Sequence, residues 1–529
     1  MWLAVFEQCL RTGLARRSRS LRIMQYGFVL DQRRCIGCHA CTVACKSENE
    51  VPLGDFRTWV KYTEVGEFPS VKRHFAVLRC NQCTDAPCIT VCPVTALHKR
   101  PDGIVDLDKD ACIGCKACMQ ACPYDALSLN EETGGAEKCH FCAHRIEQNL
   151  KPACEVVCPE TAIISGDLHD PESPVSKILA EVGGSKVRRP EQGTGPNVFY
   201  LGAHDASLEP GTAKEEDSYI WSDRREPKVE LPEKDRKALQ RDDAVVVLDV
   251  NHKIHWGWKV SAYLLTKGIA AGAVLWAPFL AMTGVGSDFA RNYLPELLGL
   301  FFLVVTNVLL VMDLKRPKMF LTIILRPNMK SWLVKGAYVL MAFGAITSAS
   351  LAARFFGMNE LADGLRWVNL ISASLTAAYT AFLFAQCEGR DLWQNTRLLL
   401  PHLMVQALCV GGAIMLPFIP DTKLAIAVVV LAVVHQLFGL MERFGKHETH
   451  NAKMAAALLP GVKAWKGSGL SAFYFGMGTT TLAALVALLL VLGGAANPLA
   501  LVFCALVAWL GLFLYEQAYV RAGQLPPLA

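Results

Sequence analysis

Four groups of closely spaced cysteines are the strongest chemical signal in this chain of 529 residues. Sixteen of its twenty cysteines fall between residues 35 and 158. Their spacings are Cys35-x2-Cys38-x2-Cys41-x3-Cys45, Cys80-x2-Cys83-x4-Cys88-x3-Cys92, Cys112-x2-Cys115-x2-Cys118-x3-Cys122 and Cys139-x2-Cys142-x11-Cys154-x3-Cys158. Thiolates are soft ligands that suit iron–sulfur clusters or zinc. The pattern therefore predicts a fourfold repeat of one metal-binding unit.

The spacing within each group favours one kind of metal centre. Three cysteines separated by two residues can surround an iron–sulfur cluster, and a fourth cysteine three residues later can reach a neighbouring cluster. The small Gly37 and Gly114 between them let backbone amides face the sulfurs. A zinc ribbon uses paired Cys-x2-Cys groups and would not need the third and fourth cysteines. A disulfide framework fits less well still, because this is not a small secreted domain.

Three stretches in the same region carry a family resemblance: RCNQCTDAPC at 79–88, DACIGC at 110–115 and RPEQGT at 189–194. With them, residues 26–205 resemble the four-cluster ferredoxin subunit of molybdopterin oxidoreductases of the dimethyl sulfoxide, polysulfide and thiosulfate reductase type. The resemblance implies four 4Fe–4S clusters and no 3Fe–4S centre, because no ligand position lacks its cysteine. The implied ligand sets are Cys35, Cys38, Cys41 with Cys158; Cys139, Cys142, Cys154 with Cys45; Cys80, Cys83, Cys88 with Cys122; and Cys112, Cys115, Cys118 with Cys92.

The second half of the chain is strongly apolar. Eight apolar stretches of 18 to 24 residues, almost without charge, follow residue 255. They are 260–283, 294–313, 332–352, 367–387, 398–418, 424–441, 471–493 and 497–516. A helix needs about 20 apolar residues to cross the hydrocarbon core of a bilayer. The succession predicts an all-α polytopic bundle, and it accounts for a hydrophobic fraction of 52% that excludes a disordered chain.

Composition divides the chain into four segments. Residues 1–23 are a basic extension, and no apolar stretch of the kind a secretory signal needs follows its Arg16-Arg17 pair. Residues 24–170 are the cluster domain, residues 171–250 a polar linker or docking arm, and residues 251–522 the membrane anchor. The expected fold class is an α+β ferredoxin-like double dicluster domain followed by an eight-helix bundle. A net charge of +5 is small for this length and implies no affinity for nucleic acid.

Polar residues within the apolar stretches gather on the side of the cluster domain. They are Lys259, Tyr263, Lys267, Asn307, Asp313, Lys335, Tyr379, Gln386, His402, Gln406, His435 and Gln436. Ionisable residues at membrane depth are costly and usually functional, although any one of them could equally be a hydrogen-bonding contact within the bundle. Together they predict a polar pocket in which a lipid-soluble quinone finds proton donors and acceptors.

Short motifs in the membrane half carry a second resemblance: Trp256-Gly257-Trp258, Arg316-Pro317, Arg326-Pro327 and Tyr379-Thr380. They resemble the eight-helix anchor of the polysulfide reductase and nitrite reductase type. The resemblance implies a pocket for menaquinone or ubiquinone, and the candidate residues are His255, Tyr263, Lys267, Tyr379 and His402. Haem is the rival ligand, because His402 and His435 are the two histidines within the apolar stretches; we expect quinone rather than haem.

These features together predict an electron-transfer and membrane-anchor subunit that links membrane quinone to a separate catalytic subunit. The resemblance implies that this partner contains molybdopterin. Two other functions stay open. One is an ion-translocating redox module that uses Lys267, Asp313 and Glu296, and the other is a membrane-anchored iron–sulfur sensor.

Loop charges predict how the chain is oriented. Loops on the side of the cluster domain carry 13 Lys and Arg residues, and loops on the far side carry 4. The positive-inside rule then places the cluster domain on the cytoplasmic side of a bacterial or archaeal cytoplasmic membrane. Alternatively, the basic residues at 315–318 dock the cluster domain or a partner.

Overall fold

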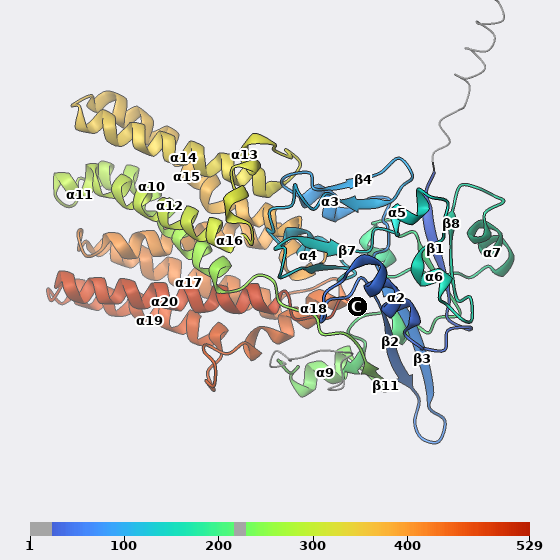
Figure 1. The fold of residues 1–529 in the computed structure, drawn as a ribbon. Helices are drawn as coiled ribbons and strands as arrows, with labels where there is room; N and C mark the ends of the chain where they lie inside the picture. The colour runs from blue at the N-terminus through green and yellow to red at the C-terminus, as the bar shows by residue number, and fades with distance from the viewer. Residues whose placement is uncertain (1–23, 216–228) are drawn as a thin grey trace, which may run out of the picture.

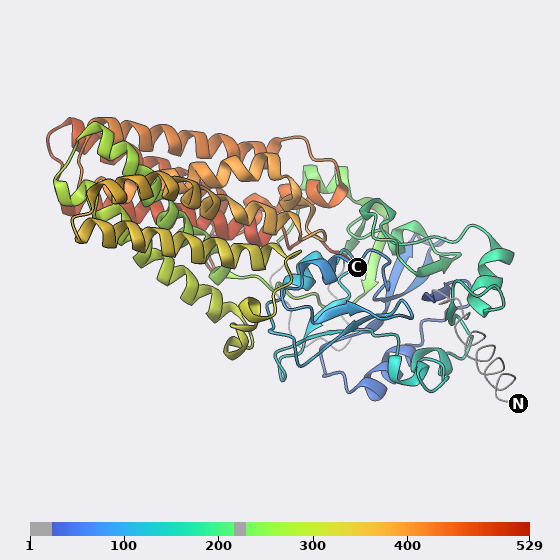
Figure 2. The same ribbon diagram turned by 90° about the horizontal axis from the view of Figure 1, so that it is seen from above.

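The computed structural model describes residues 24–215 and 229–529. It consists of two units that lie end to end (Figures 1 and 2). The cysteine-rich domain (residues 24–250) contains the sheets, and the membrane domain (residues 251–529) is helical. The predicted fold class is confirmed. The basic extension 1–23 lies outside the described residues.

Two sheets frame the cysteine-rich domain, with strand orders β8-β1-β9 and β10-β11-β2-β3. The strands are β1 (Tyr26–Asp31), β2 (Thr58–Val65), β3 (Lys72–Arg79), β8 (Ile163–Asp167), β9 (Val198–Leu201), β10 (Ala213–Glu215) and β11 (Arg241–Leu248). Strand β1 is apolar and buried in the middle of its sheet, antiparallel to β8 and parallel to β9. Aromatic and β-branched residues suit such a strand. It therefore ties the start of the domain to two later segments.

Short helices and hairpins carry the cysteine groups. The helices are α2 (Ala40–Asn49), α3 (Pro87–Val91), α4 (Ala117–Ala121), α5 (Ala143–Ile146) and α6 (Ala153–Val156). The hairpins are β4 (Leu97–Lys99) with β5 (Val105–Leu107), and β6 (Leu127–Leu129) with β7 (Ala136–Lys138). Gly37 and Gly114 have φ angles of +73° and +68°, in the left-handed region that favours glycine. These glycine turns let the backbone of the first and third cysteine groups curl inward.

Residues 171–250, predicted as a linker or docking arm, are folded where the structure describes them. They supply β9, β10 and β11 to the sheets, together with α7 (Pro174–Val182), η1 (Pro190–Gln192), α8 (Asp205–Leu208) and α9 (Glu233–Leu239). Strand β11 pairs antiparallel with β2. The described parts of this arm therefore belong to the cysteine-rich domain and are not a free linker.

Among the described residues, eight helices are long and apolar enough to cross a membrane, as predicted. They are α10 (Trp258–Thr283), α12 (Leu294–Asp313), α14 (Trp332–Phe355), α15 (Asn359–Ala385), α16 (Thr396–Met415), α17 (Thr422–Phe444), α19 (Ala472–Leu492) and α20 (Pro498–Ala522). Short pieces between them are α11 (Asp288–Asn292), η2 (Pro317–Met319), α13 (Thr322–Leu325), η3 (Asp391–Gln394), α18 (His450–Leu458) and η4 (Leu459–Gly461). Helices suit this setting because they satisfy their own backbone hydrogen bonds, which lipid cannot.

Small residues set the close packing of the bundle. A Cβ atom on Gly272 of α10 would overlap the carbonyl oxygen of Ala407 of α16, and one on Gly411 would overlap the backbone of Gly272. Helices α19 and α20 meet in the same way at Gly476 and Gly511. Helix association in lipid depends on such contacts, since hydrophobic burial alone does not drive it. They bring the polar side chains of α16 and α20 towards α10.

Segments of the membrane domain bind the cysteine-rich domain directly. The backbone nitrogen of Lys315 donates to the carbonyl oxygen of Gly114 at 3.3 Å, and the Arg316 guanidinium donates to three carbonyl oxygens of the same region. After α20 the chain returns to the cysteine-rich domain (Figure 2), where Lys61 Nζ of β2 donates to the carbonyl oxygen of Ala529 at 3.0 Å. Lys315 and Arg316 therefore dock the cysteine-rich domain, which is the alternative role expected for the basic residues at 315–318.

Candidate functional site

One cavity of the cysteine-rich domain is lined by four thiols from two cysteine groups. Cys112, Cys115 and Cys118 come from the third group and Cys92 from the second, around a volume of about 380 Å³. The backbone nitrogen of Ala136 donates to Cys112 Sγ at 3.4 Å. The structure thus brings together the four cysteines expected to hold one cluster.

A second cavity, of about 310 Å³, has the same construction. Cys139, Cys142 and Cys154 of the fourth group and Cys45 of the first group line it. The completely buried Arg79 joins them, and its Nη1 donates to Cys154 Sγ at 3.2 Å. A buried guanidinium needs anionic neighbours, and thiolates or a cluster that they hold would supply the negative charge.

A third set of cysteines combines Cys80, Cys83 and Cys88 of the second group with Cys122 of the third group. Burial raises the pKa of the Cys88 thiol well above its usual value, and the nearby Cys122, Cys80 and Cys83 raise it further. Thiols gathered in such a dry site keep their protons unless a metal centre replaces them. The set is the one expected for the third cluster.

The last set lies at the surface. Burial raises the pKa of Cys35, and the neighbouring Cys158 and Cys38 add to this shift. Cys41 has Cys35 among its neighbours. Cys38 is exposed, and the backbone nitrogen of Ala162 donates to Cys158 Sγ at 3.2 Å. Of the four sets, this is the one that contains an exposed cysteine.

The four sets form a row. Electrostatic contacts between consecutive sets join Cys41 to Cys154, Cys80 to Cys139, and Cys88 to Cys118. Each set offers four thiolates with backbone or guanidinium donors near the sulfurs, and this donor set fits a 4Fe–4S cluster, whose chemistry is one-electron transfer. The row runs from the exposed Cys38 to the membrane domain.

The membrane end of the row contacts the helices directly. Trp256 Nε1, just before α10, donates to the carbonyl oxygen of Cys115 at 3.5 Å. Asn328, in the connection to α14, donates through Nδ2 to the carbonyl oxygen of Cys92 at 2.8 Å. The indole of Trp256 also stacks on Trp393, with ring centroids 5.6 Å apart. The stacked indoles of Trp256 and Trp393 therefore extend from this cysteine set to the membrane domain.

Three of the five candidate quinone residues meet inside the bundle, and we call them the quinone trio: Tyr263, Lys267 and Tyr379. Lys267 of α10 is 1% exposed, and its Nζ lies 4.9 Å from the ring centroid of Tyr379 of α15. The same ammonium group donates to Thr380 Oγ1 at 2.6 Å. Tyr263 is buried on α10 and lies near Tyr379. Two phenols and an ammonium group are suitable donors for a quinone oxygen.

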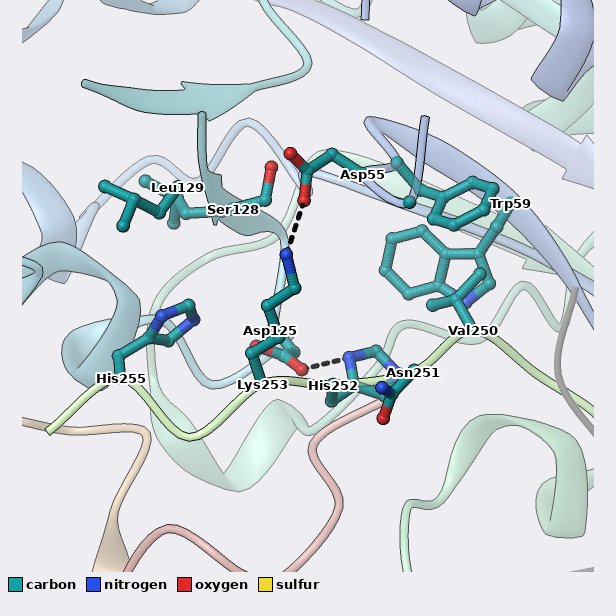
Figure 3. A pocket seen from close by; sticks show the side chains of 13 residues that line it. Asp55, Trp59, Asp125, Ser128, Leu129, Val250, Asn251, His252, Lys253 and His255 are labelled. Atoms are coloured by element: carbon teal, nitrogen blue, oxygen red, sulfur yellow. Dashed lines mark ion pairs between the residues drawn. The ribbon is translucent and has the colours of Figure 1, made fainter. Parts of the chain in front are cut away.

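His255 lies apart from the quinone trio. It lines a cavity of about 420 Å³ between the start of the membrane domain and the cysteine-rich domain (Figure 3). In the same cavity Asp125 pairs with His252, and Lys253 Nζ lies 3.6 Å from Asp55. Burial lowers the pKa of His255 to about 4, so its imidazole is neutral near neutral pH. It is placed at the junction of the two domains.

His402 belongs to another buried network. Its Nδ1 lies 2.9 Å from Glu442 Oε1, and its Nε2 lies 2.7 Å from Nδ1 of His435. Tyr515 donates to the other carboxylate oxygen of Glu442. Because the two imidazoles are in direct hydrogen-bond contact, an iron ion does not fit between them. The geometry does not suit a haem ligated by these two histidines.

Sequence reasoning missed three members of this network: Glu442, Tyr515 and Glu516. Glu442 directly follows the sixth apolar stretch and Glu516 closes the eighth, so both look like helix ends. Helices α17 and α20 continue beyond them, and both carboxylates are buried. The signal that could have found them is an acid at the cluster-side end of two apolar stretches.

The acids foreseen for an ion route do not lie together. Asp313, at the last residue of α12, pairs with Lys116 of the cysteine-rich domain. Glu296, in the first turn of the same helix, lies 3.8 Å from Arg366. A helix of this length spans about 30 Å. The two acids therefore stand at opposite ends of the bundle.

A row of cysteine sets attached to a helical bundle defines a membrane-anchored iron–sulfur protein of electron transfer. Residues 71–168 match the family of 4Fe–4S dicluster domains. Residues 246–524, more than half of the sequence, match the family described as polysulphide reductase, NrfD. This protein belongs to the NrfD family, and it is a multi-pass membrane protein.

Several relatives resemble the cysteine-rich part. A subunit of the tetrathionate reductase of Salmonella typhimurium is 47% identical over 189 residues, which are 35% of this chain and 76% of the relative. Thiosulfate reductase electron transfer subunit PhsB of Salmonella typhi is 42% identical over 171 residues, 32% of this chain and 86% of the relative. A polypeptide of the polysulfide reductase of Wolinella succinogenes is 39% identical over 182 residues, 34% of this chain and 94% of the relative.

Proposed function

We propose that the chain passes electrons between a membrane quinone and a separate catalytic subunit through four 4Fe–4S clusters. The observation that carries this proposal is the contact of Trp256, two residues before α10, with the carbonyl oxygen of Cys115. It puts one end of the cysteine row against the helix that also carries Tyr263 and Lys267. A redox partner that dissolves in lipid and exchanges protons fits this place.

The quinone trio supplies the proton chemistry. Reduction of a quinone takes two electrons and two protons, and oxidation of a quinol returns them. The Lys267 ammonium group and the Tyr379 phenol orient a quinone oxygen by hydrogen bonds and hold the proton that is exchanged there. Menaquinone and ubiquinone both present two ring oxygens, so the trio suits either.

The catalytic partner is proposed to be a molybdopterin subunit that docks at the exposed end of the cysteine row. The named relatives are parts of reductases, one of them an electron transfer subunit. Around the exposed Cys38, the apolar side chains of Ile36 and Val157 are 56% and 40% exposed. Exposed apolar residues around a redox centre suit a protein interface.

The cysteine-rich domain is proposed to face the cytoplasm, with the bundle in the cytoplasmic membrane. Lys315 and Arg316 bind the cysteine-rich domain, so they are left out of the count of loop charges. The remaining 11 Lys and Arg residues on this side still exceed the 4 on the far side. Cleavage of right-side-out and inverted vesicles by a protease tests the orientation: cleavage in the cysteine-rich domain is expected in inverted vesicles only.

Quinol-driven reduction of the clusters tests the pocket. Full-length protein with its clusters is mixed with excess decylubiquinol, and the visible absorbance of the clusters is followed in a stopped-flow instrument. We expect Tyr379→Phe and Lys267→Met to slow the reaction by about a hundredfold, because each removes a proton donor. Tyr474→Phe is the matched control, since this tyrosine of α19 is 43% exposed. Full activity in both pocket variants would place the quinone elsewhere.

Iron and sulfide analysis tests the clusters. Four 4Fe–4S clusters require about sixteen irons per chain. About eight irons would overturn the assignment of four clusters. Zinc in place of iron would overturn iron–sulfur ligation altogether.

A further inference from the structure

A line of buried side chains connects the quinone trio with the surface next to the cysteine-rich domain. We propose that this line is the route by which protons enter and leave the quinone pocket. The inference rests on the proposed quinone function and adds residues that electron transfer does not need. These residues come from α16, α17, α20 and the loop that follows α17.

The outer end of the line is His447, in the loop after α17. Its imidazole hydrogen bonds to the backbone of Glu442, and the side chain is half-buried. The Glu442 carboxylate is 3% exposed. His447 is therefore a partly exposed imidazole beside the first buried acid, whose charge acts on it.

The middle of the line is a cluster of groups that hold protons. Glu442 Oε1 lies 2.9 Å from His402 Nδ1, and the second nitrogen of His402 contacts His435. Tyr515 donates to the other oxygen of Glu442. His402 is completely buried, as is nearly all of His435. Imidazole and carboxylate side chains in hydrogen-bond contact can pass a proton from one to the next.

The inner end of the line reaches the quinone trio. Gln406, one turn along α16 from His402, hydrogen bonds to Glu516 of α20, and its Nε2 lies 3.5 Å from His402 Nε2. Glu516 in turn faces Lys267, whose ammonium group stands over the Tyr379 ring. The other ionisable groups near Glu516 are Glu442, Tyr263, Tyr515 and Tyr519. Glu442 and Glu516 are therefore joined through side chains of three helices, α16, α17 and α20.

A purely structural role does not account for this set. Charged residues inside a membrane bundle are costly, and the helices already pack through their glycines. Glu442 and Glu516 lie close enough to repel each other when both are ionised. A pair of acids that shares protons avoids this repulsion, and a shared proton is what a route needs.

Among the described residues, the line leads from the quinone trio to the side of the cysteine-rich domain. Glu296, the buried acid near the far end of the bundle, is engaged with Arg366. When one quinol is oxidised, its two O–H bonds break and its two electrons pass singly to two clusters. The two protons pass by way of Lys267, Glu516, His402 and Glu442 to solvent at His447. Quinone reduction runs the same steps backwards.

The test uses the full-length protein with its clusters and decylubiquinol as the probe. We expect Glu442→Gln to lower the limiting rate of cluster reduction by roughly a hundredfold. The half-saturating quinol concentration stays unchanged, and the rate ratio between H2O and D2O rises. Glu442→Asp recovers part of the rate because it restores the carboxylate. Glu448→Gln, at an exposed acid of the same loop, is the matched control.

Dithionite separates the possible outcomes, since it reduces the clusters without quinol. If dithionite reduces the clusters of the wild-type chain but no quinol does, the proposed function is wrong, and so is this inference. If quinol reduces the clusters of the wild type and of the Glu442→Gln variant equally fast, the proton route alone is wrong. If Glu442→Gln fails to fold, His402→Gln replaces it, with the same expected loss of limiting rate and the same overturning result.

Discussion

Lys116 Nζ lies 2.9 Å from a carboxylate oxygen of Asp313, although the two residues are 197 positions apart in the chain. Lys116 belongs to the third cysteine group, and Asp313 is the last residue of the second membrane helix. Their side chains are 6% and 18% exposed. The ion pair therefore fixes the cysteine set nearest the membrane to the end of a transmembrane helix.

Breaking this pair should loosen the junction. Removing one partner of a buried ion pair costs about 3–5 kcal/mol, because the other charge stays buried without compensation. We expect Lys116→Met and Asp313→Leu each to lower the temperature at which the cluster absorbance is lost. The double variant should recover part of the loss. If the double variant lowers this temperature by the sum of the two single effects, the two residues do not interact directly.

The pair of Asp125 and His252 should make the junction sensitive to pH. Burial opposes ionisation of both groups, but Asp125 and Asp249 raise the pKa of His252 to about 10. His252 in turn lowers the pKa of Asp125 to about 2. The histidine contributes stability that is complete below its unfolded pKa of about 6.5 and is lost as pH rises towards 10. The carboxylate contributes above about pH 4 and loses its contribution as pH falls towards 2.

The junction should therefore be tightest between about pH 4 and pH 6.5 and should loosen on the alkaline side. Limited proteolysis in residues 249–255 at increasing pH measures this loosening. His252→Gln should remove the alkaline dependence, and the exposed His98→Gln should leave it in place. An unchanged profile in His252→Gln would assign the dependence to another group.

The packing of α10 on α16 gives a prediction about the bundle. A Cβ atom on Gly272 would overlap the backbone of Ala407, so Gly272→Val forces the helices apart. Overpacking of this kind costs about 1–3 kcal/mol or more. The detergent-solubilised variant should lose its monodisperse state at a lower temperature. Gly478→Val is the control, because nothing lies within 4 Å of a Cβ atom at Gly478.

Arg79 should tune the clusters beside it. Its guanidinium is buried and contacts Cys154, so it favours the more negative, reduced state of a neighbouring cluster. We expect Arg79→Leu to lower the reduction potential of at least one cluster, as measured by redox titration with electron paramagnetic resonance. Arg79→Lys keeps the charge and should shift the potential less. Identical potentials in all three proteins would exclude this electrostatic effect.

The features that could be predicted from the sequence are those that depend on the spacing of residues close together in the chain. The cysteine intervals and the apolar stretches each lie within one short segment, and each of the eight stretches lies largely within one of the eight long helices, although α15 begins earlier and α17 and α20 end later than expected. The folded state of residues 171–250 was not predictable in this way, because β11 gains its stability from pairing with β2, far away in the chain.

The candidate site shows the same limit. Tyr263, Lys267 and Tyr379 could be proposed from their types and places, and they lie together. Glu442 and Glu516 were missed because each stands at the edge of an apolar stretch, where an acid usually faces water. Their burial depends on how α17 and α20 extend past those edges and pack on α16, which no single stretch reveals.

The return of the chain after α20 has a mechanical consequence. Lys61 holds the Ala529 carbonyl oxygen at one place, and Trp256 holds the cysteine row at another. The cysteine-rich domain is thus held to the bundle by one segment that precedes the eight helices in the chain and one that follows them. It therefore does not move between an electron donor and an acceptor, and we expect the internal electron-transfer rate to be independent of solvent viscosity.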